Sequence, residues 1–411
     1  MKSMSLDTPQ GRIEGHYDSA FAAVAAAFVE NFSKRDEVGA SVALTLEGHT
    51  VIDLWGGRRA RNGAAWQRDT VATVFSATKG AMALCAHMLA DRGALDLDAN
   101  ISEYWPEFAV AGKEDARVGM TLDHSVGVPH VRDVVPPGGF YDYQAMVQRV
   151  AAEPAFWEPG TRVGYHAITM AWTVGELVHR AAHKRLGKFF QDEVAAPLGL
   201  EFWIGMPSDL HGRISPMIAA VPDQPWMESR FVKAALGTVG TPTQLFMRDF
   251  LLVDANSADC HAAEIGSANG LANARALAGM YAPLANGGSI NGTRLVGPDT
   301  LARMARTSMA SHDDATLMAR MNFSEGFMKA IDNRRTPHTV NSSLLIAAGA
   351  FGHVGAGGSL GFADPDSRMS FGYAMNRMGT GLLLNERGQS LVDAAYGALG
   401  YRSTASGAWC R

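Results

Sequence analysis

The chain has 411 residues, which is long enough for a large hydrophobic core and for two domains or subdomains. Hydrophobic residues make up 47% of it and charged residues 19%, with a formal net charge of −5, so the composition is that of a globular protein and not of a disordered one. No Lys/Arg run indicates a nucleic-acid surface, no segment has the apolar length of a membrane span, and the first residues lack the apolar stretch of a signal peptide, so we expect a cytoplasmic protein without nucleic-acid or membrane partners.

The N-terminal part predicts a helix followed by a β-hairpin. Residues 20–32 are mostly Ala, Val and Phe and favour a helix. Residues 41–46 and 50–55 flank a short turn that contains Gly48, which is typical of a hairpin. A polar loop follows, and the chain then reaches Ser76, where we expect a sheet to give way to helices.

A serine and a lysine stand three residues apart in Ser76-Ala77-Thr78-Lys79, at the predicted start of a long helix. At this spacing both side chains point to one face of the helix. A serine hydroxyl needs a nearby base to act as a nucleophile, and a lysine amine can serve where its surroundings disfavour the ammonium form. The N–H of a serine at a helix N-terminus is also free to face an oxyanion.

The alternative is an ordinary helix start, with Ser76 as the N-cap and Lys79 in solvent. The helix argues against this, because its apolar residues cover most of its circumference and predict a buried helix. These residues are Met82, Leu84, Cys85, Met88 and Leu89. An unpaired buried lysine is costly, so Lys79 needs a reason to be there.

The middle of the chain predicts helices, and the end predicts a return to the sheet. Tyr165 is expected at the start of another buried helix, and residues 204–265 are mixed in character, so we place a loose boundary there. After it we expect a helix, a Gly-rich stretch, a strand and a final helix. Their ranges are 273–284, 350–361, 368–375 and 389–399.

Three separated stretches fit one known pattern. They are Ser76-Ala77-Thr78-Lys79, Tyr165-His166-Ala167 and His353-Val354-Gly355, with further likenesses at 124–129, 197–200 and 357–365. On these residues the chain resembles the class C β-lactamase-like serine hydrolases, particularly the family VIII carboxylesterases. The resemblance implies an α/β (α+β) fold, with an antiparallel sheet flanked by helices beside a second, mostly helical domain. We expect residues 1–75 with 266–411 to form the first domain, residues 76–265 the second, and the active site the cleft between them.

The resemblance also implies roles for the matching residues. Ser76 would attack the carbonyl, while Lys79 and Tyr165 would exchange the protons that activate it and protonate the leaving group. Which of these two is the base stays open. The oxyanion would bind the N–H groups of Ser76 and of Ala356, which follows Gly355.

Two departures from the lactamase pattern favour a plain ester over a β-lactam. Ala167 stands where lactamases carry an asparagine, so a side-chain amide that would contact the lysine and the substrate is missing. His353 stands where they carry a lysine, and a histidine is mostly neutral near pH 7 and binds a substrate carboxylate less firmly. We therefore expect a serine hydrolase of short-chain carboxylic esters.

Alternatives within the fold are a β-lactamase, an acyltransferase or amide hydrolase, and a non-catalytic ligand-binding domain. Residues 357–361 also spell G-x-S-x-G, but no histidine follows Ser359, and a strand-like run replaces the helix that a nucleophile elbow needs. We expect no nucleotide cofactor, because the sequence has neither a P-loop nor a complete G-x-G-x-x-G.

Several other residues carry weaker expectations. His179 and His183 are spaced for one helix face, and we expect a polar face there and no metal site, because a third ligand is missing. His124 and His130 are expected to be structural loop histidines, although either could line the cleft. Single aromatic residues more often fill a core than shape a substrate pocket. The candidates for such a pocket are Tyr141, Phe156, Trp157, Trp226 and Phe323. The widely spaced cysteines, expected to be free thiols, are Cys85, Cys260 and Cys410.

Overall fold

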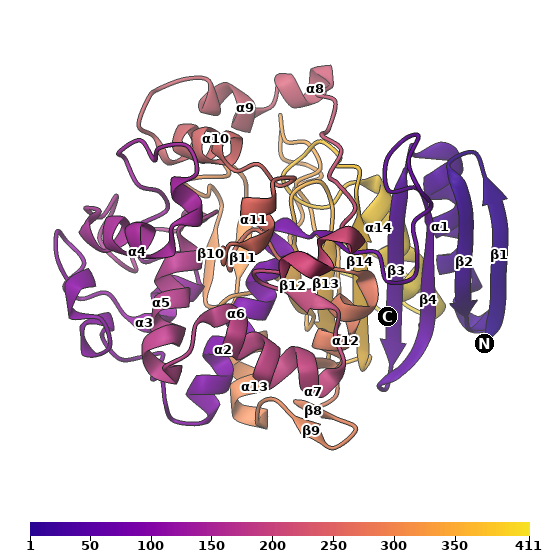
Figure 1. Cartoon of the computed structure of the whole chain (residues 1–411), viewed down its shortest axis with the longest axis horizontal. Helices are drawn as coiled ribbons and strands as arrows, with labels where there is room; N and C mark the ends of the chain where they lie inside the picture. Colours follow the sequence, from indigo (N-terminus) through magenta and orange to yellow (C-terminus); the bar gives the residue numbers. More distant parts are fainter.

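Strands from both ends of the chain form one antiparallel sheet of seven strands in the computed structural model, which describes residues 1–411 (Figure 1). The order is β1–β2–β4–β3–β14–β13–β12, and all neighbours are antiparallel. The strands are β1 Lys2–Thr8, β2 Gly11–Tyr17, β3 Gly39–Leu46, β4 His49–Gly57, β12 Phe351–Val354, β13 Leu360–Asp364 and β14 Met369–Met375. The expected hairpin is β3–β4, and the expected C-terminal strand is β14.

The sequence did not predict β1 and β2, at one edge of the sheet. Most side chains of β1 are exposed, so the strand lacks the alternation of buried and exposed residues that reveals a strand in a sequence. β2 pairs with β4, with Tyr17 opposite Ile52. These two strands form because they pair with a neighbouring strand, and not because their sequence has a hydrophobic pattern.

Helices cover both faces of the sheet. Val42 and Leu44 of β3 belong to a cluster of 42 buried residues that includes α1 (Ala22–Lys34) and α14 (Glu386–Ala398). Between them, Ala43 faces the opposite way and packs on α12 (Ala274–Ala285). We call the larger group the sheet cluster. The helices expected at 20–32, 273–284 and 389–399 are α1, α12 and α14.

The close approach of α12 to the sheet depends on small residues. Gly372 of β14 pairs with Ala43 of β3, so both lie under the helix. A side chain at Gly372 would clash with the carbonyl of Ala274 in the first turn of α12. The small residues therefore let α12 lie directly on the middle of the sheet.

The other half of the molecule is a helical layer around α2. Every residue of α2 from Thr78 to Leu89 is buried, and a second cluster of 57 buried residues, the helical cluster, surrounds it. Phe75 belongs to the sheet cluster and Ala77 to the helical cluster, so Ser76 lies where the two clusters meet. The helices of this half are α2 Thr78–Asp91, α3 Val118–Leu122, α4 Tyr143–Ala152, α5 Met170–Ala182, α6 Leu186–Phe190, a π-helical turn Gln191–Ala195 and α7 Ala196–Leu198.

The region of mixed sequence character contains four short helices. They are α8 Gln224–Met227, α9 Arg230–Ala235, α10 Pro242–Leu252 and α11 Ala258–Ala262. Of these, α8, α9 and α10 lie at the top of Figure 1, and α11 lies near its centre. We call residues 221–252 the cap segment. Its exposed apolar residues are Val221, Met227, Leu236, Val239, Phe250 and Leu251. Short helices with outward apolar side chains give no clear period, which explains the unassigned sequence.

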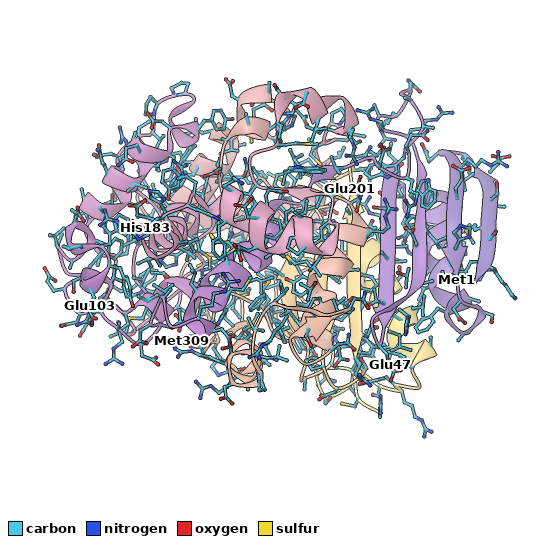
Figure 2. All side chains as sticks on the ribbon, turned by 60° about the horizontal axis from the view of Figure 1, so that its bottom comes forward. Met1, Glu47, Glu103, His183, Glu201 and Met309 are labelled. Atoms are coloured by element: carbon cyan, nitrogen blue, oxygen red, sulfur yellow. The ribbon has the colours of Figure 1, made fainter.

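The remaining elements are short. They are α13 Pro298–Ala305, a three-stranded sheet of β5 Ala72–Thr73, β7 Leu271–Ala272 and β6 Phe202–Trp203, and the pairs β8 Ser289–Ile290 with β9 Thr293–Arg294 and β10 Met309–Ser311 with β11 Met321–Phe323. None of the helices has both the length and the apolar character that a membrane crossing needs. The three cysteines are free, as expected. In Figure 2, Met1 and Glu47 lie at the sheet end of the molecule and His183 at the helical end.

Candidate active site

Ser76 lies at a single opening in a buried stretch of chain. It occupies a 3₁₀ turn, Phe75–Ala77, directly before α2. From Thr70 to Leu89, Ser76 is the one residue that is not buried. The preceding Phe75 has a φ of +45°, in the left-handed region that a bulky side chain rarely adopts. Such strain persists only where the surroundings enforce it, and it is found at functional sites.

Lys79 is fully buried and its amine faces Ser76. Nζ lies 3.1 Å from Ser76 Oγ, 2.7 Å from the carbonyl oxygen of Ala167 and 2.9 Å from that of Ser267. Burial places the pKa of Lys79 well below its usual value, and no carboxylate offsets this effect. The surroundings therefore favour the neutral amine.

Tyr165 lies beside Lys79, with its ring centre 4.7 Å from Nζ. Burial raises the pKa of Tyr165, while a hydrogen bond with the Ser76 side chain acts in the opposite direction. The phenol is therefore favoured over the phenolate. Our prediction that Tyr165 starts a helix was wrong, because α5 begins only at Met170.

The loop that carries Tyr165 is fixed by a carboxylate. Asp314 Oδ1 accepts the backbone N–H of Tyr165 at 3.0 Å and also those of Thr316 and Leu317. The ring of Tyr165 packs in one cluster with Phe323 and His124, at 6.2 and 4.7 Å between ring centres. These contacts hold the hydroxyl in place without a regular element.

The turn after β12 brings a second free N–H to the site. From Ala350 to Asp364, Ala356 is the one residue that is not buried. Its N–H and that of Ser76 donate no hydrogen bond within the chain. β12 is an edge strand and packs against the turn that holds Ser76. The two unpaired N–H groups thus belong to adjoining segments.

His353 is buried in β12 and is a neutral hydrogen-bond acceptor. Burial and the nearby Lys79 lower the pKa of His353 to about 3. Its Nδ1 lies 2.8 Å from the carbonyl oxygen of Val354 and must carry the proton, because a carbonyl only accepts. Nε2 is therefore the acceptor, and it has no partner. Its ring centre is 6.1 Å from that of Tyr165.

The residue at position 167 affects the lysine differently from our expectation. The missing asparagine predicted a lost contact to Lys79, but the backbone carbonyl of Ala167 accepts from the amine directly. That contact is replaced, and only the amide group that would face a substrate is absent. Ala167 is also the one residue from Val163 to Val178 that is not buried.

The other candidates lie outside this constellation or support it. Ser359 is fully buried and donates to the carbonyl of Val74, and the chain after it is strand β13. His179 and His183 do not share a helix face, because α5 ends at Ala182 and His183 adopts a left-handed conformation. His130 contacts Asp249 at 3.0 Å, as a structural histidine would.

Of the five aromatic candidates, Phe323 packs on Tyr165, and Trp157 lies 6.1 Å from His166 between ring centres. The other three lie in different surroundings: Tyr141 beside Ser257, Phe156 under Arg132 and Trp226 against Phe231. Two cavities, of about 470 and 560 Å³, have linings that contain none of Ser76, Lys79, Tyr165, His353 and Ala356.

Sequence reasoning missed several residues around the site. Ser267 and Ala167 act through backbone carbonyls, which no side-chain pattern reveals. Asp314 acts on backbone N–H groups, and its sequence neighbourhood has no motif. His124, expected to be a structural histidine that could line the cleft, packs on Tyr165, and its Nδ1 accepts the N–H of His166.

Known proteins similar to this chain include several hydrolases. The model of the Beta-lactamase family matches residues 21–396. The chain is 32% identical over 364 residues to Esterase/beta-lactamase LipL of Mycobacterium tuberculosis (strain ATCC 25618 / H37Rv), covering 87% of this chain and 81% of that protein.

Two solved structures extend this likeness to the fold. One is a family VIII carboxylesterase, with 36% identity, a TM-score of 0.80 and coverage of 94% of this chain and 99% of the other. The other is a penicillin-binding protein homologue from Caulobacter crescentus, with 32% identity, a TM-score of 0.81 and the same coverage. The expected fold, an antiparallel sheet flanked by helices, is confirmed. The chain belongs to the beta-lactamase family, and it has the fold of the esterases and penicillin-binding proteins in that family.

Proposed function

We propose that the protein is a serine esterase that forms an acyl-enzyme on Ser76. The observation that carries the proposal is the distance of 3.1 Å between Lys79 Nζ and Ser76 Oγ, at an opening in an otherwise buried stretch. A nucleophile beside a base with a lowered pKa is the arrangement that covalent catalysis requires.

We assign the base to Lys79, because burial lowers its pKa and raises that of Tyr165. A neutral amine has two N–H donors and one lone pair. The carbonyl oxygens of Ala167 and Ser267 take the two donors, since they can only accept. The lone pair is then left for the Ser76 hydroxyl, the third neighbour of Nζ.

The reaction follows from these positions. Ser76 Oγ forms a bond to the ester carbonyl carbon as its proton passes to Lys79 Nζ, and the carbonyl oxygen accepts the N–H groups of Ser76 and Ala356. The carbon–oxygen bond to the alcohol then breaks, and the alkoxide takes a proton from Tyr165, which recovers one from Lys79. A water molecule repeats the sequence on the acyl-enzyme and releases the acid.

The site favours a short, uncharged ester. A β-lactam carries a carboxylate, and His353 is neutral with its Nε2 buried, so it supplies no cation for that carboxylate. Ala167 has no side-chain amide for a substrate amide. An ester needs only the nucleophile and the two N–H groups, and a family VIII carboxylesterase is among the similar structures.

Two assays test the proposal. An organophosphonate should label one residue, and peptide mass spectrometry should place the adduct on Ser76, with Ser76→Ala as the unlabelled control. p-Nitrophenyl butyrate should be hydrolysed with a kcat/KM far above that for nitrocefin near neutral pH. A nitrocefin value equal to or above the butyrate value would make the protein a β-lactamase, and no turnover of either would leave a ligand-binding domain.

A further inference from the structure

The turn between β12 and β13 is fastened to the segment that carries Ser76. The Ser359 hydroxyl is fully buried and donates to the carbonyl oxygen of Val74 at 2.8 Å. The same oxygen accepts the N–H of Ala77 at 3.1 Å and so closes the turn around Ser76. One carbonyl oxygen is therefore shared by the turn that holds Ser76 and the turn that holds Ala356.

The two segments lie as close together as their backbones allow. A side chain at Gly355 would clash with both the Val74 carbonyl oxygen and the Ser359 hydroxyl. The Gly355 N–H donates to the Ser359 carbonyl at 2.7 Å, which closes the turn between the strands. From the other side, Asn385 Nδ2 donates to the Gly357 carbonyl at 2.7 Å. The turn is thus fixed at both ends, and at Gly355 no side chain separates it from Val74.

We propose that Ser359 is a positioning residue of the oxyanion site, because its hydroxyl sets the distance between the N–H groups of Ser76 and Ala356. This inference rests on the proposed function, since an oxyanion forms only if Ser76 attacks a carbonyl. Donors stabilise an oxyanion when both lie about 2.7–3.1 Å from it. Here they belong to segments that are 280 residues apart, so a contact between these segments has to fix their spacing.

A serine is suited to this position. Its side chain is small enough for a buried site beside Gly355, and it offers the Val74 carbonyl a second donor beside the N–H of Ala77. In Ser359→Ala this carbonyl would still accept the N–H of Ala77, so no backbone group is left unpaired and the variant is expected to fold. The variant loses only the contact that fixes the spacing between the segment of Ser76 and the turn of Ala356.

The test compares Ser359→Ala with the wild-type protein on p-nitrophenyl butyrate. We expect kcat to fall by about 10- to 100-fold, part of the roughly 10²–10³ that the loss of a whole oxyanion donor costs. KM should stay within about twofold, because the substrate's ground state gains little from these donors. Labelling of Ser76 by an organophosphonate should slow in parallel. Ser359→Cys, with a weak S–H donor, should fall between the two proteins.

Ser370→Ala is the matched control. Ser370 is also fully buried in the sheet, and its hydroxyl shares one hydrogen bond of 2.7 Å with Thr45. It lies in β14, and its hydroxyl partner belongs to β3 and not to the site. We expect Ser370→Ala to lower Tm by about 1–3 °C, as Ser359→Ala should, while its kcat stays unchanged.

A kcat of Ser359→Ala within twofold of wild type overturns the inference, and so does an equal loss in Ser370→Ala. If Ser359→Ala does not fold, Ser359→Cys decides instead: a wild-type kcat in that protein overturns the inference, and a reduced kcat with unchanged KM supports it. These outcomes are distinct from failure of the proposed function, which would appear in the wild-type protein as an adduct on a residue other than Ser76.

Discussion

The stretches that carry the candidate site and the cap segment differ in how their side chains meet solvent. Three buried stretches open at one residue each, Ser76, Ala167 and Ala356. The cap segment instead exposes apolar side chains, with Val239 at 85% and Leu251 at 75% of their surface. The chemical groups are therefore held by dense packing around small openings. Changes there should affect the chemical step, and changes in the cap segment should affect substrate binding or nothing.

The largest effect is expected for Ser76→Ala. Loss of the nucleophile should lower kcat for p-nitrophenyl butyrate by roughly 10⁴-fold or more. The free energy of unfolding should change by less than about 0.5 kcal/mol, because Ser76 is partly exposed and packs little. Steady-state kinetics and urea unfolding measure the two quantities. Residual activity above about 1% would show that another residue is the nucleophile.

The proton carriers should give the next largest effect. Lys79→Ala and Tyr165→Phe should each lower kcat by at least about 10²-fold, the usual scale for general acid–base catalysis. The double variant should lose less than the product of the single losses, because the two groups act on one proton path. A near-normal kcat in Tyr165→Phe would remove it from this path.

The pH dependence should identify Lys79 as the base. Only the neutral amine accepts a proton, so kcat/KM should fall about tenfold per pH unit as the pH drops below the lowered pKa of Lys79. His353 should add no step between pH 5 and 8, since its pKa is about 3. The measurement is a pH–rate profile of wild type. An inflection that stays at the same pH in the residual activity of Lys79→Ala would assign another group in place of the lysine.

The same lowered pKa makes stability depend on pH. Unfolded Lys79 titrates near 10.4, and the folded residue titrates well below that value. Between these pH values the unfolded chain binds more protons, so the free energy of unfolding should rise with pH, by at most about 1.4 kcal/mol per pH unit. Urea unfolding of wild type and Lys79→Met at pH 7, 8 and 9 measures the difference. Parallel slopes in the two proteins would show that the pKa of Lys79 in the folded protein is not lowered.

Phe250→Ala tests the cap side of the comparison and should give a smaller effect. The ring of Phe250 is 38% exposed and lies 6.3 Å from that of Phe75, the residue before the nucleophile. We expect the exposed face of this ring to pack on the p-nitrophenyl group. Such an aromatic contact contributes about 0.5–1.5 kcal/mol, so KM for p-nitrophenyl esters should rise about 2- to 10-fold with little change in kcat. Leu251→Ser, at the neighbouring exposed position, is the control and should change neither KM nor Tm. A large fall of kcat in Phe250→Ala would contradict the division between the two regions.

Much of the fold could be predicted from the sequence, for reasons that differ along the chain. The β3–β4 hairpin has a glycine turn between apolar runs, and α12 and α14 have strong helical patterns. The strands β1 and β2 and the cap helices could not be predicted, because their regularity comes from pairing and from contacts with distant residues. A pattern that burial does not impose leaves no period to detect.

The candidate site divides in the same way. Ser76, Lys79 and Tyr165 stand in motifs, and the structure brings them together. The partners that position them do not stand in motifs, because Asp314 binds backbone N–H groups and Ser267 contributes a backbone carbonyl. The fold of the chain brings these partners to the site, and the residues next to them in the sequence do not indicate it.

Two of the three partners of the Lys79 amine are main-chain carbonyls, those of Ala167 and Ser267. A library of side-chain substitutions cannot delete these acceptors, so a mutational scan would report the lysine as essential and pass over its surroundings. Point mutations therefore leave the two carbonyl acceptors of this base in place, and the acceptors remain when the side chain at position 167 is changed. Replacing the peptide bond between Ala167 and Ile168 by an ester bond would weaken the carbonyl as an acceptor and reach a part of the site that genetic variation does not.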